Sequence, residues 1–222
     1  MRKRKNRKAV DGHRLEIRPV RQDDGYSCGL CAMQAIYDHY ALDSSDLATY
    51  LGTGNIPLPY IMPFRDEIES AILSVLPEFA DFRGTLPQDI MAVLRKDGFT
   101  TYAVAGFDRN AVRSNISAGH PVLALVRWCH WIVISGIDDR GVWIADSMGG
   151  GKVYHRSDEE FRNIITGLII LRRSRSARRK SFSEMSTMDF AWEYARATQH
   201  CAEMLLSTGE DLLFRKLPRL FS

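Results

Sequence analysis

The sequence predicts an α+β domain, with helices in its first half and an antiparallel sheet in its second half. Between positions 28 and 119, apolar residues recur at helical spacing, and prolines and glycines mark where segments start and stop. From position 121 onward, short β-branched and aromatic runs alternate with turn residues, which is the pattern of short strands. Helices followed by strands pack as separate layers, so these two observations together define the class.

Four segments of the first half are expected to be helices. The first, CGLCAMQAIYDHY, begins near Cys28. The second fits PFRDEIESAILSVL, where Pro63 suits a first turn, and the third, LPQDIMAVLRKDG, lies between Pro87 and Gly98. Asp108 is placed to cap a short fourth helix.

Four strands are expected in the second half. PVLALV, HWIVISGI and GVWIAD are the first three, and residues 138–141 form a hairpin loop between the second and the third. Ser157 with Glu160 is a capping box, which predicts a short helix over EEFRNII. GLIILR then supplies the last strand.

The chain divides into four parts. Residues 1–18 are a basic N-terminal arm, 19–171 a compact domain, 172–180 a basic linker, and 181–222 a helical C-terminal extension. The first eight residues and the linker each carry six basic side chains. Solvated surface segments are the plain interpretation, and attraction to nucleic acid, acidic lipid or an acidic partner is the alternative. The net charge is only +3 but unevenly distributed, and of these partners nucleic acid is not the expected one.

The extension contains MDFAWEYARATQHCAEMLL, which predicts one amphipathic helix. This helix is expected to pack on the core, or else to bind a groove or regulate the domain. Its apolar stripe consists of Ala191, Tyr194, Thr198, Cys201 and Leu205.

Composition and targeting signals indicate a soluble, cytoplasmic protein. No apolar run approaches the ~20 residues that span a bilayer. The basic first residues are followed by the polar stretch DGHRLEIRPVRQDD, so no secretory signal peptide is expected, although export by another signal remains open. The four cysteines of such a protein do not indicate a disulfide framework.

Cys28 is the candidate nucleophile. It lies in RQDDGYSCGLCAM, where turn formers give way to an apolar periodic run, so its sulfur is expected near a helix N-terminus. Free backbone N–H groups and the helix dipole there stabilise the thiolate, which is the nucleophilic form. Gly29 is expected to leave the approach to the sulfur open. A buried structural cysteine is the alternative for any single cysteine.

His130 and Asp146 are the candidate base and orienting carboxylate. His130 begins the strand HWIVISGI, and Asp146 ends the next strand, GVWIAD. A turn centred on position 138 would place the two residues nearly opposite each other across one strand pair. A carboxylate in that position fixes the imidazole tautomer and stabilises its charged form, as nucleophilic catalysis requires. A satisfied core histidine is the alternative for His130 alone.

Gln22 lies six residues before Cys28 and is the candidate oxyanion donor. A side-chain amide upstream of the nucleophile can donate to the oxyanion of a tetrahedral intermediate, and the backbone N–H of Cys28 is the candidate second donor. A solvated loop glutamine is the alternative.

Three other motifs compete with this interpretation. Cys28 and Cys31 form a C-x-x-C at a helix start, as in thiol redox proteins, but LEIRPVRQDD is a poor buried strand to precede it. These two cysteines with Cys129 and His130 resemble a zinc set, yet neighbouring strand residues point to opposite faces, so no metal and no cofactor are expected. Residues 149–151, Gly-Gly-Gly, are interpreted as a hairpin turn, with a substrate-gripping loop as the alternative.

The segment from Gln22 to Gly29 resembles the glutamine, five residues, Cys-Gly motif of the bacteriocin-leader-processing peptidases. These papain-like domains cut after double glycine and are often fused to ABC exporters. GHPVLALVRWCHWIVISGIDDRGVWIADSMGG is similar to their histidine–glycine–aspartate segment, and the resemblance covers residues 19–171. It implies a papain-like fold, with Gln22, Cys28, His130 and Asp146 in the roles given above.

Two positions depart from that family. Ser27 stands where the family usually has aspartate, and Ser147 where it usually has proline. The cysteine segment also resembles that of the peptidases of ubiquitin-like modifiers, which place the histidine and aspartate before the cysteine and not after it.

The function predicted from the sequence is a cysteine peptidase that acts on a peptide or isopeptide bond of a protein or peptide substrate. Deamidation or acyl transfer by the same residues is the enzymatic alternative. A binding module on the same scaffold, with the basic segments and the tail helix making the contacts, is the non-catalytic alternative.

Overall fold

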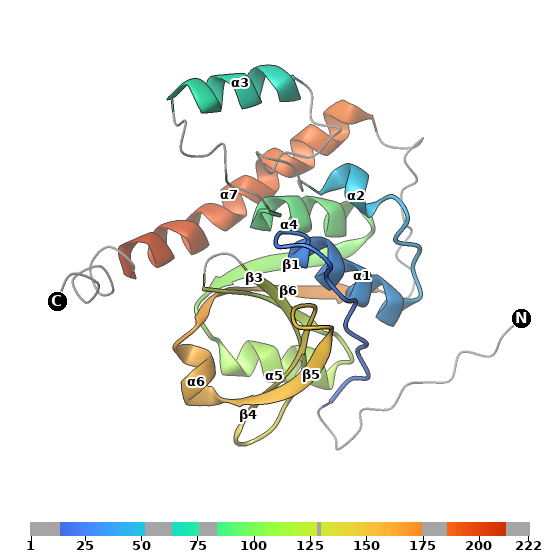
Figure 1. The fold of residues 1–222 in the computed structure, drawn as a ribbon, viewed down its shortest axis with the longest axis vertical. Coiled ribbons are helices and arrows are strands. Elements are labelled where there is room, and N and C mark those ends of the chain that lie inside the picture. The colour runs from blue at the N-terminus through green and yellow to red at the C-terminus, as the bar shows by residue number, and fades with distance from the viewer. Residues whose placement is uncertain (1–13, 52–63, 76–83, 128–129, 175–185, 212–222) are drawn as a thin grey trace, which may run out of the picture.

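The computed structural model describes residues 14–51, 64–75, 84–127, 130–174 and 186–211. Helices dominate the first half and strands the second, as the α+β prediction requires (Figure 1). The helices are α1 (Cys28–Tyr40), α2 (Leu47–Tyr50), α3 (Arg65–Val75), α4 (Pro87–Lys96), α5 (Arg109–Ser117), α6 (Asp158–Arg162) and α7 (Thr187–Asp211). The strands are β1 (Phe99–Ala105), β2 (Val122–Val126), β3 (His130–Ile137), β4 (Gly141–Asp146), β5 (Lys152–Ser157) and β6 (Ile165–Arg173).

The six strands form one antiparallel sheet in the order β1-β6-β2-β3-β4-β5. The four predicted strands are β2, β3, β4 and β6, whose apolar side chains are almost all buried. The prediction missed β1 and β5, which are the two edge strands. The edge strand β5, KVYHRS, exposes its first residues and keeps polar side chains along its length, so it lacks the apolar pattern of a central strand.

Local capping explains where several helices begin. The side chain of Asp108 accepts hydrogen bonds from the backbone of Asn110 and Ala111, which starts α5 as predicted. Ser157 and Glu160 form the predicted capping box of α6. Pro87 is the first residue of α4, whereas Pro63, predicted to start α3, lies outside the described residues.

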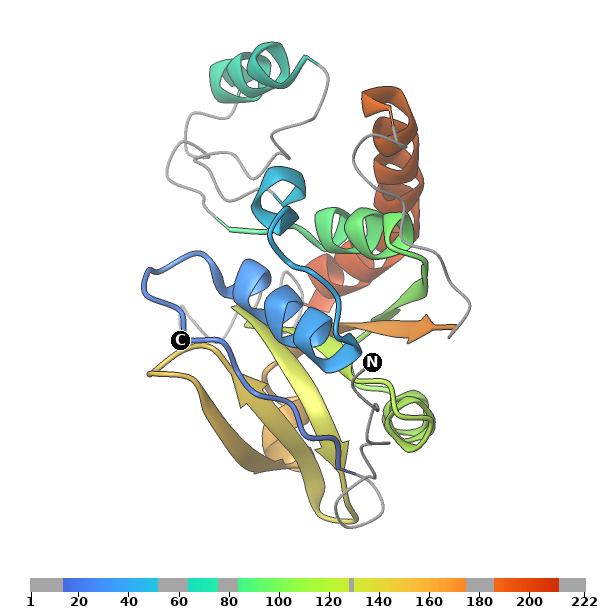
Figure 2. The same cartoon turned by 90° about the vertical axis from the view of Figure 1, so that its right-hand side faces the viewer.

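The N-terminal segment that precedes α1 is part of the core from Arg14 onward. Arg14 pairs with Gly136 of β3, and the backbone N–H of Leu15 donates to the carbonyl of Ser135 at 2.6 Å. Leu15 and Ile17 are buried, although they fall within the predicted basic arm. Figure 2 shows this segment running along the sheet toward the start of α1. The segment that carries the candidate site is thus anchored to β3.

Helix α1 packs against β3, and α4 and α7 pack against each other and against β1. The described side chains of α7 include three fully buried ones, Phe190, Ala197 and Cys201, and Tyr194 is partly buried in the same interface. Thr198, predicted on the apolar stripe, is exposed, and the side chain of Leu205 lies outside the described residues. The independence of residues 19–171 from this helix stays a prediction.

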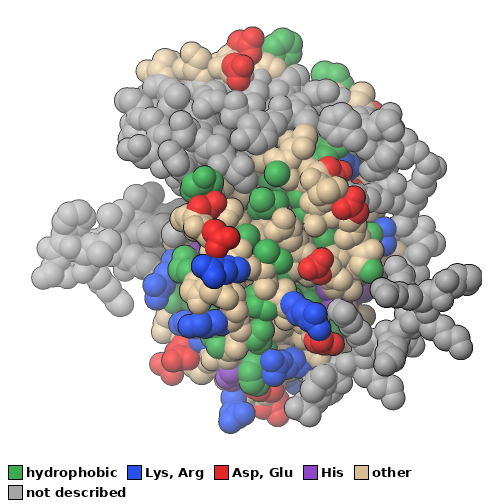
Figure 3. Space-filling view, turned by 45° about the vertical axis from the view of Figure 1, so that its right-hand side comes forward, with side chains coloured by type: hydrophobic (Ala, Val, Ile, Leu, Met, Phe, Trp, Pro, Cys, Tyr) green, Lys and Arg blue, Asp and Glu red, His purple; other side chains and the backbone are tan. Residues whose placement is uncertain are grey.

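Within the described part of the chain, no helix is long and apolar enough to cross a membrane. On the face seen in Figure 3, the lysine and arginine side chains are interspersed with aspartate and glutamate. The described residues of that face therefore present no field of a single sign.

Candidate active site

Cys28 is the first residue of α1, as predicted. The turn before it is held by Asp24, whose Oδ1 accepts hydrogen bonds from the backbone N–H groups of Tyr26 at 2.9 Å and Ser27 at 2.6 Å. This turn brings the chain into the helix so that Cys28 lies at its N-terminal end. Cys28 is only 3% exposed, so its sulfur lies in a largely desolvated position near the backbone N–H groups of the first turn.

His130 and Asp146 meet at the adjoining ends of β3 and β4. Nε2 of His130 lies 2.7 Å from Oδ1 of Asp146, a hydrogen bond that the imidazole donates to the carboxylate. The predicted register, however, is wrong by two residues. Val133 is opposite Ala145, so this part of the strand pair is centred on position 139 and not on position 138.

Continuing that register places Asp146 opposite Ile132, so that Asp146 is a diagonal neighbour of His130. Next to the turn Ile137 is opposite Val142, three residues from the predicted register, and the irregularity between Ile134 and Gly136 takes back one of those residues. The contact survives the shift because a move of two residues keeps a side chain on the same face, and long side chains reach diagonal neighbours.

His130 also connects to Cys28. Burial on its own lowers the pKa of His130, but hydrogen bonds with Asp146 and Cys28 outweigh burial and raise that pKa to about 9. Since Nε2 is bonded to Asp146, Nδ1 is the ring nitrogen left for Cys28. The structure therefore brings the three predicted residues into one chain of contacts, and it favours a protonated imidazole between two groups that can carry negative charge.

Asp146 is held by more than its histidine. Burial raises the pKa of Asp146, but hydrogen bonds from His130, the backbone of Met148 and Tyr154 lower it below its ordinary value overall. The backbone N–H of Met148 donates to Oδ1 and the hydroxyl of Tyr154 donates to Oδ2, both at 2.9 Å. Sequence analysis missed Tyr154 because its strand, β5, was not predicted.

The side chain of Gln22 is bound by two neighbours. Its Nε2 donates to the backbone carbonyl of Asp24 at 2.7 Å, and its Oε1 accepts from the hydroxyl of Ser147 at 3.1 Å. The backbone N–H of Gln22 donates to the carbonyl of Ser147 at 3.0 Å. Gln22 is therefore tied to the turn that precedes Cys28 and to the residue that follows Asp146.

Gly29 serves the packing of α1, and its role in leaving the approach to the sulfur open stays a prediction. A Cβ at this position would lie 2.5 Å from Cβ and Oγ1 of Thr85, so only glycine lets Thr85 approach the helix this closely.

Cys31 is buried with its sulfur 3.7 Å from the carbonyl of Arg21, and burial raises the pKa of its thiol. A thiol held in its neutral form does not favour the redox interpretation. Cys129 lies outside the described residues.

The turn that joins β4 to β5 contains Gly149, Gly150 and Gly151, all with positive φ. Glycine is the residue that adopts this conformation without strain, which agrees with the predicted hairpin turn.

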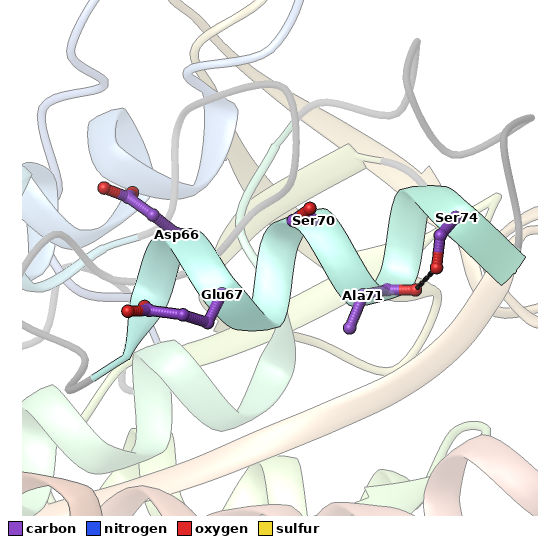
Figure 4. A pocket seen from close by; sticks show the side chains of 5 residues that line it. All are labelled: Asp66, Glu67, Ser70, Ala71 and Ser74. Carbon is purple, nitrogen blue, oxygen red and sulfur yellow. Dashed lines mark hydrogen bonds between the residues drawn. The ribbon is translucent and has the colours of Figure 1, made fainter.

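Figure 4 shows a separate surface hollow along α3, lined by Asp66, Glu67, Ser70, Ala71 and Ser74. None of the residues proposed for catalysis lines this hollow.

Several solved structures are similar to this fold, and two of them are peptidase structures from ABC transporters. A double glycine motif protease from an AMS/PCAT transporter, in complex with the leader peptide, is 13% identical with a TM-score of 0.51, and the match covers 74% of this chain and 97% of that chain. The peptidase domain of Streptococcus ComA, a bifunctional ABC transporter involved in a quorum-sensing pathway, is 20% identical with a TM-score of 0.50, over 72% of this chain and 100% of that chain. No family model matches the sequence, and no curated protein matches it.

These similarities show the fold. The protein is an α+β domain with the papain-like architecture of the peptidase domains found in double-glycine-processing ABC transporters. This is the class that the cysteine and histidine segments resemble in sequence.

Proposed function

We propose that this protein is a cysteine peptidase that cleaves a peptide or isopeptide bond with Cys28, His130 and Asp146. The observation that carries the proposal is the position of His130, bonded to the carboxylate of Asp146 at 2.7 Å and to the thiol of Cys28, with its pKa raised to about 9. A protonated imidazole beside the sulfur stabilises a thiolate, and the same proton is available to a departing amine.

The reaction follows from these positions. The thiolate of Cys28 attacks the substrate carbonyl, whose electron pair moves to the oxygen, and the backbone N–H of Cys28 with the side chain of Gln22 binds that oxyanion. When the intermediate collapses, the C–N bond breaks and the amine takes the proton of His130, which leaves a thioester. His130 then accepts a proton from water, the water oxygen attacks the thioester, and the thiolate leaves as the acid is released.

The relative solved with a leader peptide is named as a double glycine motif protease. An extended peptide with two glycines before the cleaved bond is therefore the first substrate class to test for this chain. Internally quenched peptides with Gly-Gly at the central bond, and matched peptides with Ala-Ala, would be incubated with the full-length protein and analysed by mass spectrometry.

Cys28→Ala is expected to lower turnover by on the order of 10⁴-fold or more, since loss of a triad member typically has this effect. Cys31→Ser is the matched control, because it changes the other cysteine of the same helix turn and is expected to keep activity. Cleavage by Cys28→Ala at the wild-type rate would refute the proposal. Release of ammonia without chain cleavage would indicate a deamidase, and binding without any turnover would indicate a non-catalytic module.

A further inference from the structure

Ser147 is a buried polar residue next to the catalytic carboxylate, and it contacts Gln22 twice. Only 5% of Ser147 is exposed. Its carbonyl accepts from the backbone N–H of Gln22 at 3.0 Å, and its hydroxyl donates to Oε1 of Gln22 at 3.1 Å. Ser147 therefore binds both the backbone and the side chain of the residue proposed to donate to the oxyanion.

The second of these contacts sets the direction of the amide. Oε1 of Gln22 points to the hydroxyl of Ser147, while Nε2 donates to the carbonyl of Asp24 at 2.7 Å. Rotating the amide by half a turn would place Oε1 against that carbonyl, and two acceptors facing each other cannot share a proton. An amide nitrogen carries two hydrogens, so the bond to Asp24 leaves the second one for another acceptor.

We propose that Ser147 is a positioning residue, whose hydroxyl holds the carboxamide of Gln22 so that its remaining N–H is available to the oxyanion. The inference rests on the proposed function. Ser147 acts through Gln22 and does not touch the substrate. Because it directly follows Asp146, the same short segment fixes the orientation of the base, through the carboxylate, and of the oxyanion donor, through the hydroxyl.

A purely structural role can be separated from this one. The backbone bond from Gln22 to the carbonyl of Ser147 does not need the hydroxyl. Gly151 also approaches the same segment, since a Cβ there would lie 3.5 Å from the carbonyl oxygen of Pro19 and 3.6 Å from Arg21. Ser147→Ala thus keeps the loop in place and removes only the hydrogen bond to the amide.

The test compares two reactions of Cys28 in the full-length protein. Acylation by p-nitrophenyl acetate forms a thioester through an oxyanion and releases p-nitrophenolate. Alkylation by iodoacetamide displaces iodide without forming an oxyanion, so it reports the thiolate alone. Rates measured with Cys28→Ala are subtracted as background in both reactions.

Ser147→Ala is expected to lower the acylation rate by about five- to tenfold, the effect of one neutral hydrogen bond, and to leave the alkylation rate within about twofold. Ser147→Thr, which keeps a hydroxyl, is expected to retain most of the acylation rate, and Ser147→Val is not. In a Gln22→Ala background, Ser147→Ala is expected to have no further effect, because the group it positions is gone. If Ser147→Ala fails to fold, the acylation rates of Ser147→Thr and Ser147→Val give the same comparison of a side chain with and without a hydroxyl.

A wild-type acylation rate in Ser147→Ala, or an equal loss in the Gln22→Ala background, would overturn the positioning role while leaving the peptidase proposal in place. If wild type and Cys28→Ala were acylated at the same rate, the peptidase proposal would fail, and the positioning role with it.

Discussion

The protonation of His130 gives the sharpest test of the site. Its pKa is raised from the ordinary 6.5 to about 9, with Asp146 contributing both a hydrogen bond and an opposite charge. At about 1.4 kcal/mol per unit, this rise corresponds to roughly 3 kcal/mol in favour of the imidazolium, shared between Asp146 and Cys28. Asp146→Asn keeps the size of the side chain and removes its charge, so the pKa of His130 is expected to fall by about 1–2 units.

The assay is the NMR titration of the imidazole signals of His130, with the pH dependence of cleavage of the internally quenched Gly-Gly peptide followed beside it. In the wild-type protein the cleavage rate is expected to fall as pH rises through about 9, where His130 loses the proton that the departing amine takes. In Asp146→Asn this fall is expected at a lower pH.

Asp138→Asn is the matched control for this experiment. Asp138 forms a similar pair, with Nε2 of His155 3.2 Å from its Oδ1, at the other end of the same hairpin. This control is expected to leave the fall in rate where the wild type has it. An unchanged pH profile in Asp146→Asn would show that the carboxylate does not set the protonation of His130.

Stability gives an independent reading of the same pKa. Because the folded-state pKa of His130 lies above its unfolded value, the stabilisation is fully present below about pH 6.5 and is lost as pH rises through about 9. The pKa of Asp146 is lowered, so its contribution is present above its ordinary pKa of 3.8 and is lost as pH falls. The difference in unfolding free energy between wild type and Asp146→Asn is therefore expected to be larger at pH 6 than at pH 10, as urea denaturation would measure.

Three further changes test other parts of the structure. Gln22→Ala is expected to lower the acylation rate by about 10²-fold and to leave iodoacetamide alkylation unchanged, and equal effects on both reactions would contradict the oxyanion role. Gly29→Ala is expected to destabilise the fold by about 1–3 kcal/mol in urea denaturation, because the new Cβ would overlap Thr85, whereas Gly25→Ala, with no atom within 4 Å, is the control. Truncation after Arg173 is expected to keep the acylation of Cys28 but to lower the free energy of unfolding by about 3 kcal/mol or more. The reason is that removing α7, with Phe190 and the other buried residues of that helix, exposes the surfaces of α4 and β1 that it covers. A fragment without Cys28 reactivity would show that α7 belongs to the catalytic core.

Local sequence signals were sufficient for the elements that deliver the candidate triad. Cys28 follows a turn-forming run and precedes an apolar periodic one, which places it at a helix start. His130 and Asp146 lie at the ends of two short apolar strands that a hairpin joins, so they must meet at one end of the sheet. Each of these inferences depends only on neighbours in sequence and on helix or strand periodicity.

The remaining parts of the site depend on contacts that periodicity does not encode. The register of β3 on β4 follows from a loop that leaves Ile137 opposite Val142 and from an irregularity between Ile134 and Gly136, and strand periodicity specifies neither. Tyr154 reaches Asp146 from an edge strand whose polar composition hides it. The hydroxyl of Ser147 is one among many, and its partner Gln22 lies 125 positions away. Short polar side chains gain a role only when the fold fixes their distance from a partner.

The candidate site is assembled from three separate stretches of chain, and hydrogen bonds between them make it one unit. The segment before α1 is bound to β3 through Leu15, and its turn is closed by Asp24. Gln22 joins that segment to the residue after Asp146, and His130 joins Asp146 to Cys28. Each group needed for the proposed reaction is therefore oriented by a partner on another stretch. A change that loosens the N-terminal segment should affect the oxyanion donor first, because Gln22 depends on it directly, and the His130–Asp146 pair least, because β3 and β4 hold that pair by themselves.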